Sequence, residues 1–421
     1  MLDINRIRNN KEEVEKALLK KNYKVDFTEL LNMDSLRRSK IFEVEQMKAK
    51  KNAVSADIPK MKKQGTDVSH LLQQMKDLSS TISDLEKDIT SLELQIQRIM
   101  DYVPNTPAED VAAGDETQNV PVRYHNTKPE FAFDAKDHVT LCDTLGLIDY
   151  KRGAKLSGSG YWIYKNDGAL LEWALLNYFI TEHIKDGYEF ILPPHILNQE
   201  CGYTAGQFPK FADDVYKLTE NDQFLLPTAE TALINLHRNE VLKEEELPKK
   251  YFAYTPCYRK EAGSYRAEER GMIRGHQFNK VEMFQYTVPE KSEEALMEMV
   301  VKAENLMKGL GLHFRLSKLA AADCSFAMGK TFDIEVWIPS MGIYKEVSSA
   351  SNAYDFQAIR GSMRFKRAAT GKNEYLHTLN ASGLATSRVF PAIIEQNQNI
   401  DGSVTVPEVL RKWLGKDKIT I

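Results

Sequence analysis

Two arginine-bearing segments of the chain have the composition of a phosphate-binding site. The first runs from Cys257 to Ser264 and places Arg259 beside Lys260 and Glu261, followed by small turn residues. The second comes much later in the chain and contains Arg388. A guanidinium group is planar and presents several N–H donors to phosphate oxygens. Two arginines from separate segments therefore predict a site that holds two different phosphates of a nucleoside triphosphate.

Length and charge limit the kinds of protein that can carry such a site. The chain has 421 residues, of which 42% are hydrophobic and 28% are charged. This length and composition predict two or three domains, at least one of them with a large core. The formal net charge is -4, so any contact with nucleic acid must come from local basic patches.

The cysteines and the N-terminus predict the compartment. The chain has four cysteines, far apart and without metal-binding spacing, which we expect to be reduced and separately buried. The N-terminus is charged and lacks an apolar signal segment, and no apolar run approaches the roughly 20 residues of a membrane helix. These features predict a cytoplasmic protein without a membrane segment.

The first hundred residues carry the pattern of a helical hairpin. Alternating spacings of four and three separate the apolar residues of its second half, which are Leu71, Met75, Leu78, Ile82, Leu85, Ile89, Leu92, Ile96 and Ile99. This is a heptad pattern, and it predicts a long helix packed along one seam. A partner seam precedes it, although Arg37, Lys40 and Lys51 occupy positions that a regular heptad would make apolar. At about thirty residues per helix, an antiparallel pair would project roughly 45 Å.

The turn and the charges of this hairpin support two interpretations. Gly65 is expected to end the first helix and Asp67 to cap the second, whereas Pro59 should bend or interrupt the first. A dimerisation coiled coil is one interpretation. The other is an RNA-binding arm, because the first helix is clearly basic and suits a phosphate backbone.

The rest of the chain predicts a linker and then a second domain. Residues 104–130 contain several prolines and small residues, which is typical of a linker. Beyond it, helical patterns such as 169–184 alternate unevenly with strand-like runs, including 224–228, 278–286 and 332–338. Few regular β-α-β units are present. This order predicts an α+β domain in which a mainly antiparallel sheet is flanked by helices.

Five segments together resemble the bacterial-type seryl-tRNA synthetase family, a class II aminoacyl-tRNA synthetase family. In chain order they run from Thr228 to Glu230, Tyr258 to Ser264, Arg270 to Glu282, Glu346 to Asn352 and His377 to Ala385. The N-terminal hairpin also fits. No single segment would suffice, because an isolated arginine near a glutamate is usually a surface ion pair. The resemblance covers nearly the whole chain.

The resemblance implies roles in nucleotide binding. Arg259 matches the arginine that bridges the α-phosphate of ATP and the carboxylate of the amino acid, and Arg388 matches the arginine that reaches the γ-phosphate. Glu261 would accept from the adenine amino group, and Phe278 would stack on the adenine, although a strand phenylalanine is more often core. The remaining predicted ATP contacts are Lys260, Glu346, Val347, Ser348 and Ser349. Of these, Glu346 and Ser349 would hold Mg²⁺, which prefers hard oxygen ligands, and no zinc is expected.

The resemblance also implies a serine pocket. Glu230 and Glu282 would bind the ammonium group, with Thr228 and Ala229 beside them. Read singly, either glutamate is more often an exposed charge at a strand end. Asn380 and Ser382 would surround the side-chain hydroxyl. A site that hydrogen-bonds a hydroxyl rejects alanine strongly, because its own polar groups would otherwise stay unpaired.

Contacts with tRNA and with a second subunit are expected from the same resemblance. The candidates for tRNA contact are Arg37, Arg38, Lys48, Lys51, Arg266 and Arg270. The segment from Gly187 to Pro194 resembles the one that builds the homodimer interface in the family, although two prolines at a strand end are also an ordinary edge feature. The loop 264–270 departs from many relatives, and this puts tRNA preference in doubt more than serine activation. Ala322, Ala350 and Ala381 also depart from the family pattern.

The expected activity is ATP-dependent activation of L-serine to seryl-adenylate and transfer of serine to tRNA(Ser), with tRNA(Sec) as a further acceptor. The expected domains are a tRNA-binding helical hairpin at 1–103, a linker at 104–130 and a class II catalytic domain at 131–421. Two alternatives stay open. One is a synthetase paralogue that adenylates an amino acid for a different acceptor, and the other is a non-catalytic RNA-binding or scaffold protein.

Overall fold

The computed structural model describes residues 1–65, 67–261 and 271–421, and these form two compact units. The arm unit consists of Ile4–Lys16 and Lys24–Val103. The sheet unit consists of Met1–Asp3, Ala17–Tyr23 and Pro104–Ile421. The short segment Ala17–Tyr23 therefore belongs with the C-terminal part of the chain, although it interrupts the arm unit in sequence.

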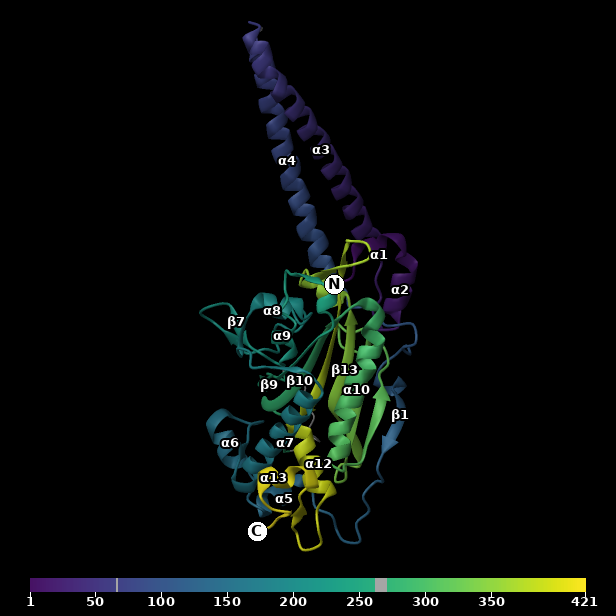
Figure 1. Ribbon diagram of the computed structural model, residues 1–421, viewed down its shortest axis with the longest axis vertical. Coiled ribbons are helices and arrows are strands. Elements are labelled where there is room, and N and C mark those ends of the chain that lie inside the picture. The colour runs from purple at the N-terminus through teal and green to yellow at the C-terminus, as the bar shows by residue number, and fades with distance from the viewer. Residues whose placement is uncertain (66, 262–270) are drawn as a thin grey trace. The chain divides into compact units, whose positions relative to one another are not determined.

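The arm unit contains the predicted helical hairpin. Helices α1 (Ile4–Asn9) and α2 (Lys11–Leu19) precede the long helices α3 (Thr28–Lys63) and α4 (Ser69–Met100), which run side by side (Figure 1). The predicted seam of α4 is confirmed, since its residues are all buried or half-buried. Gly65 has a φ of +75° in the turn, and the carboxylate of Asp67 accepts from Ser69 N at 2.9 Å.

Helix α3 continues through Pro59 to Lys63, so the predicted interruption does not occur. Proline removes one backbone donor and disturbs the preceding turn. Here it lies four residues before the last residue of α3, and the helix continues past it.

Ion pairs explain two of the three basic residues in the seam of α3. Arg37 pairs with Glu93 at 3.4 Å and Lys40 pairs with Asp88 at 2.8 Å. Lys48, next to the seam, pairs with Glu86 at 2.7 Å. All three bridges join α3 to α4. The basic helix and the mildly acidic helix are therefore electrostatically complementary as well as joined by an apolar seam.

An eight-stranded sheet forms the centre of the sheet unit, with the order β1-β11-β12-β13-β16-β10-β9-β4. The strands are β1 (Val120–His125), β4 (Glu189–Ile191), β9 (Lys249–Tyr258), β10 (Gln277–Thr287), β11 (Phe314–Lys318), β12 (Lys330–Ile338), β13 (Ile343–Tyr354) and β16 (His377–Ala385). Every neighbouring pair is antiparallel except β4 and β9, which are parallel. The prediction of a mainly antiparallel sheet is confirmed.

Strand β1 lies inside the proline-rich stretch that the sequence indicates as a linker. It pairs with β11, with Tyr124 opposite Arg315 and His125 opposite Phe314. Pro121 is tolerated because β1 is an edge strand, where one row of backbone groups has no partner strand.

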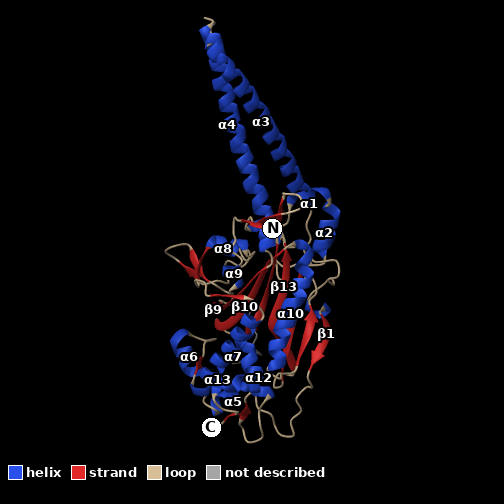
Figure 2. Ribbon diagram, in the orientation of Figure 1, coloured by secondary structure: helices blue, strands red, loops and turns tan. Residues whose placement is uncertain are grey.

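Helices α7 (Asn166–Lys185), α10 (Ser292–Gly309) and α12 (Thr386–Gln396) pack against this sheet (Figure 2). Alternation along β10 separates the two faces. Val281 and Met283 enter the core beneath the helices, whereas Phe278, Lys280 and Glu282 line a cavity. Residues two apart on a strand share a face, so one strand supplies both the core and the cavity.

Shorter elements complete the sheet unit. The helices are α5 (His138–Thr144), α6 (Tyr150–Ser157), α8 (Gln199–Thr204), α9 (Glu230–Leu233), α11 (Phe356–Arg360) and α13 (Arg411–Leu414). Small sheets join β5 (Ile196–Asn198), β6 (Lys217–Leu218) and β7 (Gln223–Leu225); β8 (Val241–Lys243), β14 (Arg364–Lys366) and β15 (Asn373–Tyr375); β2 (Ile148–Asp149) and β3 (Ile163–Tyr164); and β17 (Val404–Thr405) and β18 (Lys418–Ile419).

The cysteines are free thiols, as predicted, and Cys142, Cys257 and Cys324 are buried while Cys201 is half-buried. Within the described ranges, none of the helices has the length and apolar character needed to span a bilayer.

Candidate active site

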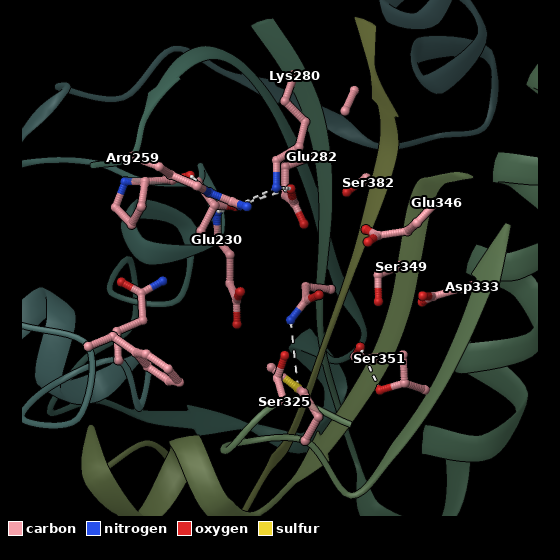
Figure 3. A pocket seen from close by; sticks show the side chains of 18 of the residues that line it. Glu230, Arg259, Lys280, Glu282, Ser325, Asp333, Glu346, Ser349, Ser351 and Ser382 are labelled. Carbon is pink, nitrogen blue, oxygen red and sulfur yellow. Dashed lines mark hydrogen bonds and ion pairs between the residues drawn. The ribbon is translucent and has the colours of Figure 1, made fainter. Parts of the chain in front are cut away.

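A cavity of about 590 Å³ lies in the sheet unit and gathers most of the predicted site residues. Strands β10, β16, β13 and β12 are consecutive neighbours in the sheet, and each contributes side chains to the cavity. Cross-strand register brings Glu282 opposite Ser382, Ser351 opposite Asn380 and Asp333 opposite Ser349. Segments far apart in sequence thus meet in one cavity (Figure 3).

The cavity sorts the predicted residues into two groups. Those that line it are Thr228, Glu230, Arg259, Glu261, Phe278, Glu282, Glu346, Val347, Ser349, Asn380, Ser382 and Arg388. Three others do not: Ala229 and Ser348 are fully buried, and Lys260 is exposed. The Ser348 hydroxyl donates to Ser382 O at 2.6 Å, so it supports the strand that carries Ser382.

Contacts around Arg259 fix its guanidinium in the cavity wall. Its Nε donates to Pro227 O at 3.2 Å, and the guanidinium carbon lies 5.2 Å from the centre of the Phe278 ring. Glu261 has a φ of +51° and pairs with Arg274 at 2.8 Å. An aromatic ring, a guanidinium group and a carboxylate therefore line the same cavity, and such a set can bind an anion and stack on a planar ring.

Arg388 and the predicted magnesium ligands form a second charged group. Arg388 Nη1 donates to Glu346 O at 2.8 Å and to Glu346 Oε2 at 3.3 Å. Figure 3 shows Glu346, Ser349 and Asp333 along one side of the cavity, with Arg259 and Glu230 on the other side. Among the described residues, Asp333 Oδ1 is buried without a hydrogen-bond partner. Burial and the nearby Glu346 carboxylate raise the pKa of Asp333 well above its ordinary value.

These oxygen donors fit a magnesium ion. Glu346 and Ser349 come from one strand, and an unsatisfied carboxylate oxygen of Asp333 lies on the neighbouring strand. In the described part of the chain, no three His, Cys, Asp or Glu side chains are grouped to hold a metal. Magnesium is commonly held by one or two carboxylates together with substrate phosphates, and the oxygen atoms of Glu346, Ser349 and Asp333 are donors of that kind.

A buried lysine occupies the predicted ammonium pocket. Lys280 Nζ forms an ion pair with Glu282 and donates to Thr228 Oγ1 at 2.7 Å. Thr228 Oγ1 in turn donates to Glu282 Oε2 at 3.2 Å. All three side chains are buried. Glu282 therefore already has one cation beside it, which the sequence did not reveal.

Glu230 is the second carboxylate of this pocket and has a perturbed pKa. Burial raises the pKa of Glu230 to about 7, and the negative charge of Glu282 raises it as well. Gln357 Nε2 donates to Glu230 Oε1 at 2.7 Å and favours the ionised form. A cation entering the pocket would also favour the ionised form, because opposite charges stabilise each other at short range.

The predicted hydroxyl-binding residues lie next to a methionine. Asn380 and Ser382 are buried on β16. Asn380 Nδ2 contacts Met328 Sδ at 3.9 Å, and Met328 lies in the loop of residues 324–329. The loop side chains of Ser325, Phe326, Ala327 and Met328 all line the cavity.

Several cavity residues were missed by the sequence analysis, among them Lys280, Asp333, Met328 and Arg274. A usable signal existed for Lys280, because it lies between Phe278 and Glu282 on the same face of a predicted strand. Asp333 was inside a predicted strand, but its nearness to Ser349 depends on the pairing of β12 with β13.

None of the four predicted tRNA contacts in α3 is among the described residues that line the cavity. In α3, Arg38 pairs with the buried Asp34 at 3.2 Å, and Arg37 and Lys48 form the bridges to α4 described above. Lys51 is half-buried in the seam. Arg266 and Arg270 lie outside the described residues.

Comparison with known proteins agrees with this architecture. Residues 1–107 match the family model described as the seryl-tRNA synthetase N-terminal domain. Residues 215–397 match the tRNA synthetase class II core domain (G, H, P, S and T).

Relatives match over the full length. The chain is 64% identical to serine–tRNA ligase 2 of Clostridium acetobutylicum, over 100% of both chains. It is 42% identical to the serine–tRNA ligase of Thermodesulfovibrio yellowstonii, again over 100% of both. The crystal structure of seryl-tRNA synthetase from Pyrococcus horikoshii complexed with ATP superposes with a TM-score of 0.93 at 34% identity, covering 100% of this chain and 99% of the other. This chain belongs to the seryl-tRNA synthetase family.

Proposed function

We propose that this protein is an ATP-dependent serine–tRNA ligase, which activates L-serine to seryl-adenylate and transfers the seryl group to tRNA(Ser). The proposal rests on one observation: a single cavity contains two arginines, oxygen donors suited to magnesium and a pocket of acidic residues suited to an ammonium group. Membership of the family agrees with it. Charging of tRNA(Sec) stays a prediction, to be tested with purified tRNA(Sec).

The first chemical step needs no protein nucleophile. The serine carboxylate attacks the α-phosphorus of ATP, and the bond to pyrophosphate breaks. Arg259 would contact both the carboxylate and the α-phosphate, because its guanidinium offers several donors in one plane. Its contacts with Pro227 and Phe278 hold that plane in place before the substrates arrive. Catalysis then consists of positioning and charge stabilisation.

The phosphates of ATP would replace existing interactions in the cavity. Arg388 now binds Glu346, and a γ-phosphate would compete with Glu346 for the same guanidinium. Glu346 and Ser349 would then hold Mg²⁺, with Asp333 close by. A bound Mg²⁺ neutralises phosphate charge and helps pyrophosphate to leave. Phe278 would stack on the adenine, and Glu261, fixed by Arg274, would accept from its amino group.

Serine would lie between the ammonium pocket and β16. Its ammonium group would contact Thr228, Glu230 and Glu282, while its hydroxyl would reach Asn380 or Ser382. Lys280 balances the charge of Glu282. The second step then transfers the acyl group to a ribose hydroxyl of tRNA, with AMP as the leaving group.

The arm unit would bind tRNA, with the hairpin proposed for residues 1–103 and the catalytic domain for 131–421. The intervening stretch 104–130, proposed as a linker, belongs to the sheet unit and contributes strand β1 to its central sheet. Support comes from the basic surface of α3 and from the match of residues 1–107 to the N-terminal family domain. Of the candidates, Arg38 and Lys48 are the more exposed, with half of each side chain in solvent.

A homodimer is the proposed assembly. Trp173 and Ile184 on α7, and Phe190 and Leu192 at β4, are exposed apolar side chains. They lie on and beside the segment whose sequence resembles the dimer interface of the family. Exposed groups of apolar residues commonly mark an interface between chains.

The decisive experiment is charging of total bacterial tRNA with labelled serine by the purified protein, with alanine and threonine as competitors. Acylation by serine alone is the expected result. Serine-dependent pyrophosphate exchange without any charging would instead support the paralogue that serves another acceptor. Absence of both exchange and ATP binding would support the non-catalytic alternative and overturn the proposal.

A further inference from the structure

Residues 324–329 form a loop at the end of the cavity where serine is proposed to bind, and it is called the cavity loop below. Its side chains Ser325, Phe326, Ala327 and Met328 line the cavity. Met328 contacts Asn380, the proposed partner of the serine hydroxyl. A shift of this loop would therefore change the space available to the serine side chain.

Two residues from the N-terminal part of the chain hold the backbone of the cavity loop. Lys21 Nζ donates to Ser325 O at 2.9 Å and to Met328 O at 2.7 Å. Asn105 donates from its backbone N to Phe326 O at 2.9 Å and from Nδ2 to Ala327 O at 2.9 Å. Four consecutive carbonyls of the loop thus each accept a hydrogen bond from Lys21 or Asn105.

Both residues lie outside the segment that matches the class II core domain. That match begins at residue 215, whereas Lys21 and Asn105 lie within the match to the N-terminal domain at 1–107. Contacts nevertheless place both in the sheet unit, together with the cavity. Lys21 comes just before the long part of the arm unit in sequence, and Asn105 comes just after it.

The environment of Lys21 agrees with a role in holding carbonyls. Burial lowers the pKa of Lys21 to about 8, with Cys324 acting in the opposite direction and the nearby Lys210 contributing to the lowering. The ammonium form donates more strongly to carbonyl oxygens than the neutral amine does. Asn105 is 2% exposed and also donates to Ala353 O at 2.8 Å, so its amide is held firmly.

We propose that Lys21 and Asn105 are positioning residues for serine binding, which act by fixing the backbone of the cavity loop against Asn380. This inference rests on the proposed function. In it, the serine pocket is completed by the N-terminal part of the chain rather than by the class II core alone. Neither residue touches the reacting atoms.

The test compares Lys21→Met with Lys20→Met in serine-dependent ATP–pyrophosphate exchange. Lys20 is a matched control, because its Nζ also donates to two carbonyls, those of Glu109 and Val111, which are not in the cavity loop. Loss of the two charged hydrogen bonds in Lys21→Met is expected to raise the KM for serine about tenfold or more. The KM for ATP should change less than about twofold, because none of the residues proposed to bind ATP lies in the cavity loop. Lys21→Arg should restore the wild-type KM for serine.

An unchanged KM for serine in Lys21→Met would overturn the proposal, as would equal rises in both KM values or a failure of Lys21→Arg to restore. Absence of serine-dependent exchange in the wild type would instead overturn the proposed function.

If Lys21→Met does not fold, the pH profiles of the KM for serine in the wild type and in Lys21→Arg test the proposal. The wild-type KM for serine should rise relative to that of Lys21→Arg above pH 8, since only lysine loses its charge there. Superimposable profiles would overturn the proposal.

Discussion

At the scale of single residues, the cavity brings charges together without a nucleophile. Arg259 is held by a carbonyl and an aromatic ring, and its proposed task is to bind the carboxylate and the α-phosphate at once. Replacing Arg259 with alanine should lower serine-dependent pyrophosphate exchange by about 10²–10³-fold or to background, because a positioned donor to the transition state is lost. The rate of serine-dependent exchange of labelled pyrophosphate into ATP, measured for both proteins, checks this prediction.

Arg152 provides the control for that experiment. Its side chain is 74% exposed and pairs only with Asp149 among the partners described for it. Arg152→Ala should retain wild-type exchange. Equal exchange in Arg259→Ala and Arg152→Ala would contradict the role of Arg259.

The ammonium pocket predicts a pH dependence of serine binding. The pKa of Glu230 is raised to about 7 by burial and by Glu282, so Glu230 is neutral below that pH and ionised above it. A neutral carboxyl attracts an ammonium group less, and the KM for serine should fall as pH rises from 6 to 8. Glu230→Gln should have a higher KM that no longer falls over this range.

Lys280 supplies a second test of the same pocket. Lys280→Met leaves Glu282 without its buried cation, and the uncompensated charge should raise the pKa of Glu230 further. The midpoint of the pH profile should then move to higher pH. A profile that stays in place would show that Lys280 and Glu230 are not coupled, and one that moves to lower pH would contradict the expected sign of the coupling.

At the scale of elements, the arm and the sheet have separable tasks. Replacing residues 40–95 with a short Gly-Ser turn should preserve serine-dependent exchange, because every described cavity residue belongs to the sheet unit. Charging of tRNA should be lost, because the proposed RNA-binding surface is removed. Persistent charging by this variant would show that the arm does not bind tRNA.

A milder variant avoids deletion. Lys48→Glu combined with Lys51→Glu reverses charge on α3, and Lys87→Glu is the control on α4, where Lys87 pairs locally with Asp84. The first variant should raise the KM for tRNA and reduce its salt dependence, because fewer phosphates are neutralised. The control should change neither.

The sequence predicted helices and strands well where the pattern lies within a single element. The heptad seam from Leu71 to Ile99 and the strand-like run from Phe278 to Tyr286 both depend on the pattern within one element, and both are confirmed. Strand β1 was not predicted, because its pairing with β11 is a long-range contact hidden in a proline-rich stretch. The predicted interruption at Pro59 is wrong, because α3 continues past it to Lys63.

The candidate site was predicted from its sequence motifs. The prediction was incomplete for residues whose place in the site depends on tertiary contacts. Spacing cannot show that Lys280 meets Thr228, or that Lys21 reaches the carbonyl of Met328. Ala229 and Ser348 lie next to cavity residues in sequence but are buried away from it. A motif therefore identifies the strand, and the pairing of strands decides which of its side chains reach the substrate.

At the scale of the whole molecule, the exposed apolar residues of α7 and β4 predict an assembly of two chains. Leu192 is 70% exposed. Leu192→Asp should convert a dimer to a monomer in light scattering, because a charge buried at an interface without a partner is strongly unfavourable. Ile400→Asp is the control, since Ile400 is 80% exposed and far from that segment in sequence. A monomeric wild type would contradict the proposed homodimer.

The heptad seam between α3 and α4 also restricts the length of the arm to steps of seven residues. Seven added residues in each helix would keep the apolar residues in register and lengthen the arm by about 10 Å. Four added residues would locally unwind the paired helices, because they do not complete a heptad. Insertions that are not whole heptads are thus poorly tolerated. Variants lengthened by whole heptads would measure how long the arm must be for RNA binding.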